Sequence, residues 1–319
     1  MIRYGAKFVN IWIDDRIHHL QRNGGISRLW RVITPLLQAH MPDCTFDANQ
    51  RPDVWLSTYY APAPQGVASV VVAYDFIAER YSAIGAQHVD AVQKRRAIAE
   101  ADAVVAISQW TANDCAQFCH KPATVAYCAT DLQRTAAAAV EQFKATYGID
   151  RPYVLLVGRR GLYKNARALY QAWPLWNAHT SAMVVAIGGE APTVDDLAFA
   201  QQYPWLRIEP TDSELAAAYS GAQALVYPSL YEGFGLPVLE ALACGCPVVC
   251  GNGGSLPEVA GDAAMIVNPL IPLSIAQGLA LATNPGNRVP LALRGYEQVK
   301  RFSWATMAAT LADTIRSIA

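Results

Sequence analysis

The sequence predicts an α/β fold of two doubly wound domains, each with a parallel sheet between layers of helices. The length of 319 residues exceeds one ordinary hydrophobic core and indicates two domains of about 150 residues each. Short apolar runs of strand length alternate with helical patterns throughout the chain, which is typical of parallel α/β layers. Apolar residues make up 53% and charged residues 16%, so both domains can bury a core.

In the first half, short apolar runs predict strands and longer segments with spaced apolar residues predict helices. Phe8–Ile13 is the first predicted strand, and a loop through Asn23-Gly24-Gly25 opens a helix at Ile26–Ala39. The basic residues Lys94-Arg95-Arg96 lie on a later predicted helix, where such residues usually form a solvated face. The other predicted elements are strands at Val54–Ser57, Ser69–Tyr74, Ala103–Ile107 and Thr124–Tyr127, and a helix at Val89–Ala101.

The second half repeats the alternation after an alanine-rich segment that contains Gly148. Arg151-Pro152 directly precede a clear strand, so we place the domain boundary near residue 148, with domains at 1–148 and 149–299. The predicted strands are Tyr153–Val157, Met183–Ile187, Ala224–Tyr227 and Pro247–Val249. The predicted helices are Ala166–Trp176, Ser213–Ser220, Pro237–Cys244, Leu273–Thr283, Leu291–Val299 and Ser303–Ile318.

Composition argues against several classes of protein. The formal net charge of −1 does not fit a general nucleic-acid binder, which usually carries a marked basic excess. No stretch approaches the roughly 20 apolar residues that span a bilayer, and the N-terminus lacks a signal-peptide pattern, so we expect a cytoplasmic protein. The 7 cysteines are read as small buried residues, because they lack the paired spacings of zinc ligands.

The residues best suited to a ligand follow the strand Ala224–Tyr227, where doubly wound sheets bind their ligands. Glycines there let the backbone approach a ligand, and amides at the following helix start favour a phosphate. Glu232 and Glu240 flank this turn, and each can accept hydrogen bonds from a diol, one on ribose and one on a transferred sugar. The alternative is an ordinary buried strand–helix unit, with Glu232 solvated and Glu240 complementing the helix dipole. The turn itself contains Gly233, Phe234, Gly235, Leu236 and Pro237.

The segment EGFGLPVLE, preceded by Pro-Ser and followed by GCPVV, resembles the Glu-x7-Glu motif of the family-four retaining glycosyltransferases. That family has the GT-B fold of two facing Rossmann-like domains with an interdomain cleft. The resemblance implies that Glu232 contacts hydroxyls of the donor sugar, that Glu240 contacts the ribose, and that the amides of Phe234–Pro237 approach the sugar and diphosphate. It is strong over residues 153–269 and extends to residues 300–319, which resemble the terminal helix that returns to the first domain.

A second match is VGRRGLYKN, which follows the strand Tyr153–Val157. Arg159 and Lys164 have the spacing of the family's basic pair, which binds the diphosphate. Arg160 could take the place of its neighbour in this pair, but we rank it below Arg159. Fixed cations are needed there because breaking the glycosidic bond develops negative charge on the leaving phosphates. The alternative is a solvated basic loop.

Two further matches lie in the first half. Gly24 and Gly25 resemble the glycine-rich turn whose amide faces the diphosphate, and GGISRLWR is similar to a branch that acts in bacterial surface polysaccharides. Arg28 faces either the cleft or the solvent. Tyr74-Asp75 stands where this branch often has His-Asp, and Asp75 is expected to orient the acceptor hydroxyl.

The resemblance implies retention of anomeric configuration, with the leaving phosphate taking the acceptor proton. Asp14-Asp15 and Asp195-Asp196 are the carboxylate pairs that a manganese-dependent enzyme would need. We expect no metal and no cofactor beyond the donor substrate, because Arg159 and Lys164 already supply positive charge at the diphosphate.

The expected donor is GDP-mannose or a UDP-hexose, and the expected acceptor is a saccharide or lipid-linked saccharide, with peripheral contact at the inner membrane face. We expect base contacts after Ile187 and around Arg207–Thr211. The alternatives are a GT-B epimerase or glycoside phosphorylase, and a catalytically weak protein that binds nucleotide sugars or glycans. An oxidoreductase or ATPase is disfavoured, because the sequence lacks a GxGxxG turn after a predicted strand and a GxxxxGK[ST] loop.

Overall fold

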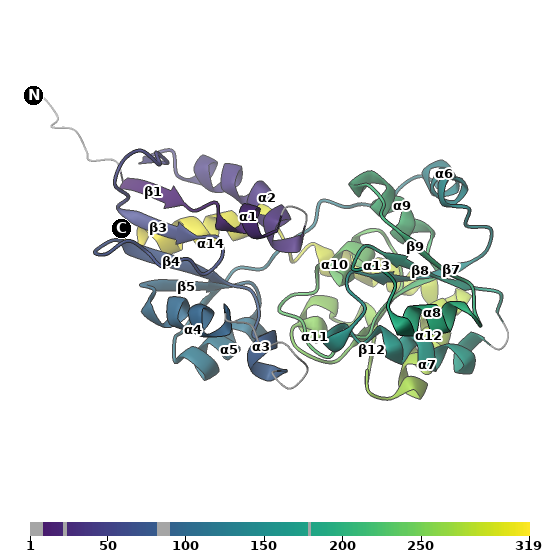
Figure 1. Cartoon of the computed structure of the whole chain (residues 1–319). Helices are drawn as coiled ribbons and strands as arrows, with labels where there is room; N and C mark the ends of the chain where they lie inside the picture. Colours follow the sequence, from purple (N-terminus) through teal and green to yellow (C-terminus); the bar gives the residue numbers. More distant parts are fainter. Residues whose placement is uncertain (1–8, 22–23, 82–89, 178–179) are drawn as a thin grey trace, which may run out of the picture. The chain divides into compact units, whose positions relative to one another are not determined.

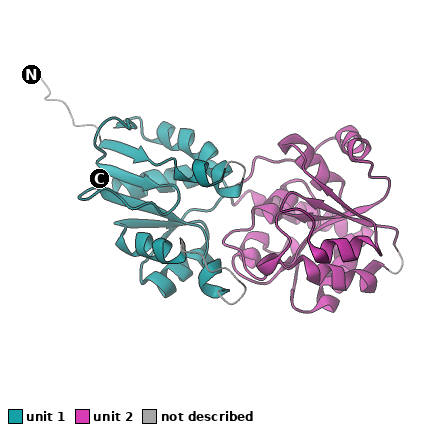
Figure 2. Ribbon diagram, viewed as in Figure 1, with its two compact units in different colours: residues 1–128, 302–319 teal, residues 129–301 magenta. Residues whose placement is uncertain are grey.

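The structure is a computed structural model that describes residues 9–21, 24–81, 90–177 and 180–319. The chain divides into two compact units (Figure 2): unit 1 is Met1–Cys128 with Phe302–Ala319, and unit 2 is Ala129–Arg301. Each unit contains a six-stranded sheet whose strands are all parallel, with helices on both faces (Figure 1). The predicted α/β class with two doubly wound sheets is confirmed.

Unit 1 has the strand order β2-β1-β3-β4-β5-β6. The order reverses between β1 and β3, which is the switch point of a flavodoxin-like sheet. Helices α2 and α14 pack against each other on one face, and α4 and α5 cover the other (Figure 1). The strands are β1 (Val9–Ile13), β2 (Cys44–Thr45), β3 (Val54–Ser57), β4 (Ala68–Ala73), β5 (Ala103–Ala106) and β6 (Thr124–Val125). The helices are α1 (Arg16–Leu20), α2 (Gly25–His40), α3 (Ile77–Arg80), α4 (Asp90–Glu100), α5 (Gln109–Cys119) and α14 (Trp304–Arg316).

Unit 2 has the order β12-β11-β10-β7-β8-β9, which numbered within the unit is the 3-2-1-4-5-6 order of dinucleotide-binding domains. Its switch point lies between β7 and β10. The strands are β7 (Tyr153–Val157), β8 (Met183–Ile187), β9 (Trp205–Ile208), β10 (Ala224–Tyr227), β11 (Val248–Gly251) and β12 (Ala264–Val267). The helices are α6 (Ala137–Tyr147), the short 3₁₀ helix η2 (Leu162–Lys164), α7 (Ala166–Trp176), α8 (Val194–Ala200), α9 (Asp212–Gly221), α10 (Leu236–Ala243), α11 (Leu256–Ala260), α12 (Pro272–Thr283) and α13 (Pro285–Val299).

The core of unit 2 explains why its central strands are continuous apolar runs. Strands β7, β8 and β10 are covered on both faces, and their residues are almost all buried. On one face, α7 and α12 pack together over a core that includes Trp173 and Leu279. On the other, α10 contacts β10 and β11. This packing holds the carboxyl ends of β7 and β10 side by side.

The division of the structure places the domain boundary after Cys128, earlier than the predicted residue 148. Helix α6 lies within unit 2 because it packs against α9. The amide of Thr135 donates to Ser220 Oγ at 3.0 Å, and Tyr147 donates to Glu214 at 3.3 Å. Residues 302–319 are part of unit 1, where α14 packs on α2.

The basic run on α4 is not uniformly solvated, which corrects the prediction for Lys94. Arg95 and Arg96 are exposed, but Lys94 is buried and its Nζ lies 2.8 Å from Glu79 Oε2. The Lys94 Nζ also donates to the carbonyl of Asp75 at 2.9 Å. Lys94 therefore ties α4 to the segment after β4 instead of facing solvent.

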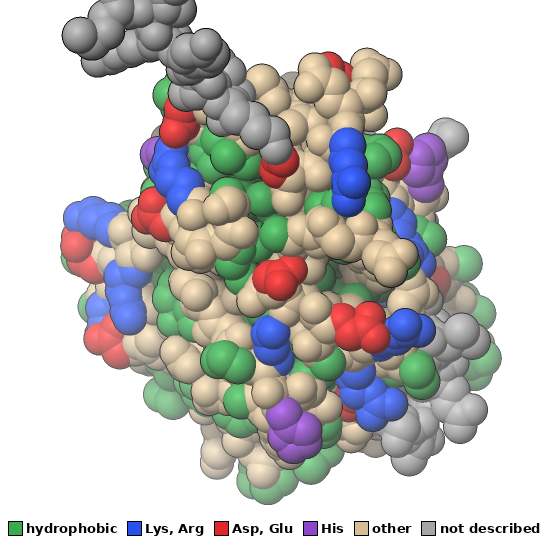
Figure 3. Space-filling view, turned by 90° about the vertical axis from the view of Figure 1, so that its left-hand side faces the viewer, with side chains coloured by type: hydrophobic (Ala, Val, Ile, Leu, Met, Phe, Trp, Pro, Cys, Tyr) green, Lys and Arg blue, Asp and Glu red, His purple; other side chains and the backbone are tan. Residues whose placement is uncertain are grey.

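Charges of both signs are interspersed on the face of the molecule shown in Figure 3, without one gathered patch of Lys and Arg. Among the described residues, no helix combines the length and the apolar character needed to cross a membrane.

Candidate functional site

Lys164 and Glu232, two of the predicted site residues of unit 2, meet at its switch point, on the loops that follow β7 and β10. Lys164 ends the 3₁₀ helix after β7, and Glu232 lies in the loop after β10. The Lys164 Nζ is 2.7 Å from Glu232 Oε1 and donates to the Tyr227 hydroxyl at 2.7 Å. Both charged side chains are largely buried, with 14% and 9% of their surface exposed. The site thus contains a shielded cation and a shielded carboxylate in direct contact.

Glu240 lies on α10, the helix that the same loop opens, and it is 5% exposed. Its Oε2 accepts a hydrogen bond from the hydroxyl of Tyr219 on α9 at 3.0 Å. Burial, and then the neighbouring Glu240 carboxylate, raise the pKa of Tyr219 well above its usual value. The tyrosine therefore stays protonated and can donate to the carboxylate.

The turn between the two glutamates leads into α10 as predicted: Gly235 is the N-cap and Leu236 and Pro237 form the start of the helix. The helix dipole adds positive potential at this start, where Pro237 has no N–H and the Val238 amide donates to the Gly235 carbonyl at 2.9 Å. Gly233 and Phe234 precede this start, and the Phe234 carbonyl accepts a hydrogen bond from Ser255 Oγ at 2.7 Å. This geometry can hold a phosphate group.

A glycine-rich segment after β11, which the sequence analysis did not single out, supports the loop that carries Glu232. A Cβ on Gly253 would lie 1.9 Å from the Leu230 carbonyl oxygen, and one on Gly254 would lie 2.3 Å from the Glu232 carbonyl oxygen. Ser255 donates from both its amide and its hydroxyl to the same Glu232 oxygen, each at 3.0 Å. The run Gly-Asn-Gly-Gly-Ser directly after a strand was the available signal.

The two adjacent arginines after β7 have different environments. Arg159 is exposed and has no contact with the Lys164–Glu232 pair, whereas Arg160 is 3% exposed. The Arg160 Nε donates to Asp196 Oδ2 at 2.7 Å, and its other nitrogens donate to the carbonyls of Gly188, Glu190 and Ala191. Arg160 therefore joins the loop after β7 to the loop after β8, while Arg159 remains accessible to a ligand.

The loop is also held by Glu190, whose Oε1 accepts hydrogen bonds from the amides of Arg160 at 3.0 Å and Gly161 at 3.3 Å. Burial raises the pKa of Glu190, but these amides and the Arg160 charge outweigh that effect, so the pKa lies below its ordinary value. Glu190 is thus ionised and fixes the backbone between Arg159 and Lys164.

Asp14 and Asp196, the buried members of the two aspartate pairs that were considered as metal ligands, form hydrogen bonds that stabilise the fold. Asp196 forms a capping box with Thr193 and pairs with Arg160. Asp14 accepts hydrogen bonds from the Thr58 amide and the Arg16 amide, each at 3.0 Å, and so joins the ends of β1 and β3. Within the described residues, no three His, Cys, Asp or Glu side chains gather in a group that could hold a metal ion.

Gly24 and Gly25 begin α2 in unit 1, and Asn23 of the same turn lies outside the described residues. The buried Ser27 hydroxyl accepts from the Gly24 amide at 3.1 Å and donates to the Gly24 carbonyl at 3.0 Å. Arg28, on the first turn of the helix, is half-buried. The backbone of Gly24 is therefore held by the Ser27 side chain at the start of α2.

Tyr74 is anchored in the core of unit 1. By the resemblance described above, it stands where the surface-polysaccharide branch of the family often has a histidine. Its hydroxyl accepts from Trp30 Nε1 at 2.6 Å and donates to the Thr58 carbonyl at 2.7 Å. Asp75 is half-buried, and its Oδ1 accepts from the Ile77 amide at 3.1 Å and lies 3.9 Å from Lys94 Nζ. Tyr74 is thus a structural residue, and Asp75 keeps an accessible carboxylate.

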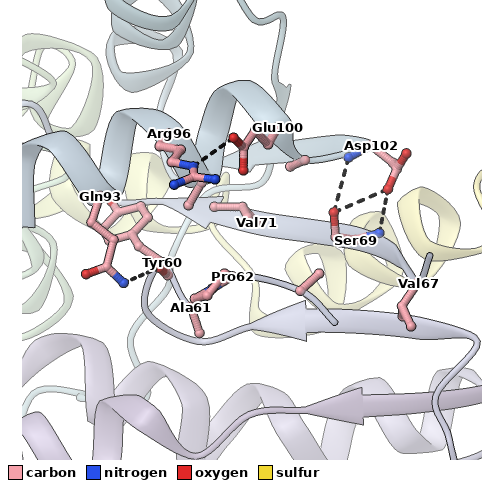
Figure 4. A pocket seen from close by; sticks show the side chains of 13 residues that line it. Tyr60, Ala61, Pro62, Val67, Ser69, Val71, Gln93, Arg96, Glu100 and Asp102 are labelled. Atoms are coloured by element: carbon pink, nitrogen blue, oxygen red, sulfur yellow. Dashed lines mark hydrogen bonds and ion pairs between the residues drawn. The ribbon is translucent and has the colours of Figure 1, made fainter. Parts of the chain in front are cut away.

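Figure 4 shows a pocket of about 560 Å³ in unit 1, between α4 and the segment that joins β3 to β4. Polar groups in its lining form hydrogen bonds with one another: Arg96 Nε donates to Glu100 at 2.8 Å, and the main-chain amide of Ser69 donates to Asp102 at 2.8 Å (Figure 4). No candidate site residue lines it, so we assign it no function.

All 7 cysteines are unpaired thiols, and the prediction that they are buried is wrong for Cys44 and Cys119, which are half-exposed. Burial is the largest cause that raises the pKa of Cys119 to about 11. It raises the pKa of the buried thiols further, to about 12 at Cys115, Cys244, Cys246 and Cys250.

Comparison with known proteins supports the fold. Residues 140–284 match the family model described as "Glycosyl transferases group 1", and this segment contains every unit 2 site residue named above. Sucrose-phosphate synthase from Thermosynechococcus elongatus superposes with a TM-score of 0.77 at 19% identity, covering 98% of this chain and 99% of that one. Anabaena HepE in complex with UDP-glucose gives a TM-score of 0.73 at 14% identity, covering 97% and 99%. The fold is the GT-B fold, and residues 140–284 are similar in sequence to the group 1 glycosyl transferases.

Curated relatives are similar over part of their length. The O-antigen chain mannosyltransferase B of Escherichia coli is 38% identical over 164 residues, which is 48% of this chain and 42% of that protein. The serotype-specific mannosyltransferase WbdA of Escherichia coli is 31% identical over 183 residues, 54% of this chain and 22% of that protein. The matches therefore span less than half the length of these relatives.

Proposed function

We propose that the protein is a glycosyltransferase that moves a hexosyl group, with mannose the first candidate, from a nucleoside-diphosphate sugar to a saccharide hydroxyl. One observation carries the proposal: a largely buried lysine and a buried glutamate are paired at 2.7 Å at the switch point of a dinucleotide-type sheet. Such switch points bind nucleotides in doubly wound folds.

The chemistry of the transfer needs the groups found there. Cleavage of the donor leaves a nucleoside diphosphate, whose developing charge Lys164 and Arg159 stabilise while the amides at the start of α10 hold the phosphates. Glu232 accepts hydrogen bonds from hydroxyls of the transferred sugar, and Glu240 accepts them from the ribose. In this proposal EGFGLPVLE is a Glu-x7-Glu motif, configuration is retained, the leaving phosphate takes the acceptor proton, and Asp75 orients the acceptor.

The donor and acceptor are proposed from the relatives. Both of the Escherichia coli relatives described above are mannosyltransferases by name, which favours GDP-mannose over a UDP-hexose. Their names also favour a saccharide acceptor in surface-polysaccharide synthesis, at the cytoplasmic face of the membrane.

The proposal is tested by measuring sugar transfer, or slow hydrolysis of the donor, for wild type and Glu232→Gln. The donors are GDP-mannose and UDP-hexoses. The Glu232→Gln substitution removes a charge from the site with little change in volume and should lower turnover about 100- to 1,000-fold. Binding of the free nucleoside diphosphate should change little. Glu297→Gln is the matched control, because Glu297 pairs with Lys300 on the surface with 72% of its side chain exposed. Wild-type turnover by Glu232→Gln would remove Glu232 from the site.

The proposed reaction needs no metal ion. Turnover should therefore be unchanged by EDTA, and loss of activity restored by Mn²⁺ or Mg²⁺ would overturn that part of the proposal.

A catalytically weak nucleotide-sugar-binding protein is the second candidate. It is favoured by Tyr74, which replaces an imidazole with a hydroxyl that is committed to Trp30 and Thr58. Donor binding without detectable hydrolysis or transfer to any saccharide would support this candidate over the enzyme.

A further inference from the structure

The ammonium of Lys164 contacts Glu232 and Tyr227, whose side chains differ in charge. Glu232 accepts from Nζ at 2.7 Å from the loop after β10, and Tyr227 accepts from it at 2.7 Å from the last position of β10 itself. The ring centroid of Tyr163 lies 5.2 Å from the same nitrogen. The lysine is therefore enclosed by groups from the two loops at the switch point and by one strand.

Tyr227 is placed on a rigid element. It is 3% exposed, and it is in register with Cys250 of β11 in the central part of the sheet. Its position is set by the sheet, whereas Glu232 belongs to a loop that is supported by Gly253, Gly254 and Ser255. A long, flexible lysine side chain needs such a fixed partner to occupy one position.

The two partners also affect the lysine charge differently. A carboxylate offsets the positive charge it contacts, while a neutral hydroxyl accepts the same hydrogen bond and leaves the charge in place. The pKa of Tyr227 is raised well above its usual value, mainly by burial and next by the nearby Glu232 charge. The tyrosine therefore remains neutral at any physiological pH.

From this geometry we propose that Tyr227 is a positioning residue for the diphosphate site: its hydroxyl holds the Lys164 ammonium against the leaving phosphates without neutralising it. The inference rests on the proposed function. In that function Glu232 turns its hydrogen bonds toward the donor sugar, and Tyr227 then keeps the lysine in place. Tyr227 acts through Lys164 and does not itself touch the reacting atoms.

The experiment is a double-mutant cycle on binding of GDP and UDP, measured by calorimetry with wild type, Tyr227→Phe, Lys164→Ala and the double variant. Tyr227→Phe should weaken binding of the preferred nucleotide about tenfold in the Lys164 background, the typical effect of one charge-assisted hydrogen bond. In the Lys164→Ala background it should change affinity less than twofold, because the ammonium it positions is gone.

Tyr153→Phe is the matched control. Tyr153 is a buried tyrosine of β7, and its hydroxyl donates to the Ala218 carbonyl at 2.8 Å, away from Lys164. Its substitution should change nucleotide affinity less than twofold.

The outcomes separate the inference from the function on which it rests. A wild-type protein that binds neither GDP nor UDP would contradict the proposed function. If wild type binds, then an unchanged affinity in Tyr227→Phe overturns the inference alone. An equal loss in both Lys164 backgrounds also overturns it, because Tyr227 would then act independently of Lys164.

Discussion

Replacing Gly254 by alanine should displace the backbone of Glu232, and Gly148 provides a control with the same positive φ. Gly254 has φ +65° and Gly148 also has φ +65°. A Cβ on Gly148 would meet nothing within 4 Å, whereas a Cβ on Gly254 would lie 2.3 Å from the Glu232 carbonyl oxygen and 2.6 Å from its amide nitrogen. The two substitutions therefore share the conformational effect and differ in the steric one.

The expected magnitudes follow from these contacts. A non-glycine residue in the left-handed region loses about 1–2 kcal/mol of stability, which should be the whole effect of Gly148→Ala. Since real Cβ contacts essentially never fall below 3.0 Å, the separation between the new Cβ and the Glu232 oxygen must grow by at least 3.0 − 2.3 = 0.7 Å in Gly254→Ala, through movement of one or both backbones. Overpacking of this kind adds about 1–3 kcal/mol. A displacement approaching 1 Å at a catalytic group also lowers turnover by roughly 10- to 100-fold.

The assay compares urea unfolding and donor turnover for wild type and both variants. Gly148→Ala should lose only the conformational contribution and keep wild-type turnover, because Gly148 precedes β7 and the loop with Arg159 and Lys164 follows the other end of that strand. Gly254→Ala should lose more stability and most of its turnover. If the two variants had the same stability and both kept full turnover, the segment after β11 would not position Glu232.

Three further predictions concern the rest of the structure. Asp196→Asn should destabilise the protein by about 3–5 kcal/mol in urea at pH 7, because it leaves the buried Arg160 guanidinium without its carboxylate. Burial raises the pKa of Asp196, but hydrogen bonds and the Arg160 charge outweigh burial and hold that pKa below the ordinary 3.8. The ionised carboxylate therefore stabilises the fold above about pH 3.8, and this stabilisation is lost as the pH falls through the folded pKa. The difference in stability between wild type and Asp196→Asn should accordingly become smaller in acid. Tyr74→Phe should lower stability by about 1–3 kcal/mol, since Trp30 Nε1 loses its buried acceptor, and an unchanged unfolding midpoint would contradict that role. Iodoacetamide at pH 8 should modify the buried thiols only after unfolding, because burial raises their pKa, to about 12 at Cys244 and Cys250. Mass spectrometry would detect the labelling. Rapid labelling of Cys244 or Cys250 in the native protein would contradict their burial.

The sequence predicted the buried strands well and the edge strands poorly, for one physical reason. Val54–Ser57, Tyr153–Val157, Met183–Ile187 and Ala224–Tyr227 were each predicted with the bounds found, because central parallel strands are continuous apolar runs. Strands β9 and β12 were missed. They lie at the two edges of the unit 2 sheet, where most of their residues are partly exposed and form no such run.

Helix bounds were predicted within one or two residues where an apolar face drives the packing, as in α7 and α12. The prediction for α13 began at Leu291, but the helix begins at Pro285, because Asn284 caps it by accepting from the Gly286 amide at 2.8 Å. A capping asparagine before Pro-Gly was a weak signal beside two residues that usually interrupt helices.

Topology explains how residues far apart in the sequence could be assigned to one site. Lys164 and Glu232 are separated by 68 positions, but each follows a strand that borders the switch point, and the structure brings them into contact. Tyr219 and Tyr227 could not be found in the same way. They lie inside a helix and a strand, where an aromatic residue is indistinguishable from an ordinary core residue until the partner of its hydroxyl is known.

The adjacent arginines show what decides between two chemically identical candidates. Arg160 is buried only because Asp196, 36 residues later, supplies a carboxylate and because carbonyls after β8 accept its remaining hydrogens. That network and the Glu190 carboxylate hold the loop backbone, while the neighbouring Arg159 is exposed. The buried arginine therefore keeps the exposed one accessible to an anionic ligand, and local sequence contains neither partner that produces this difference.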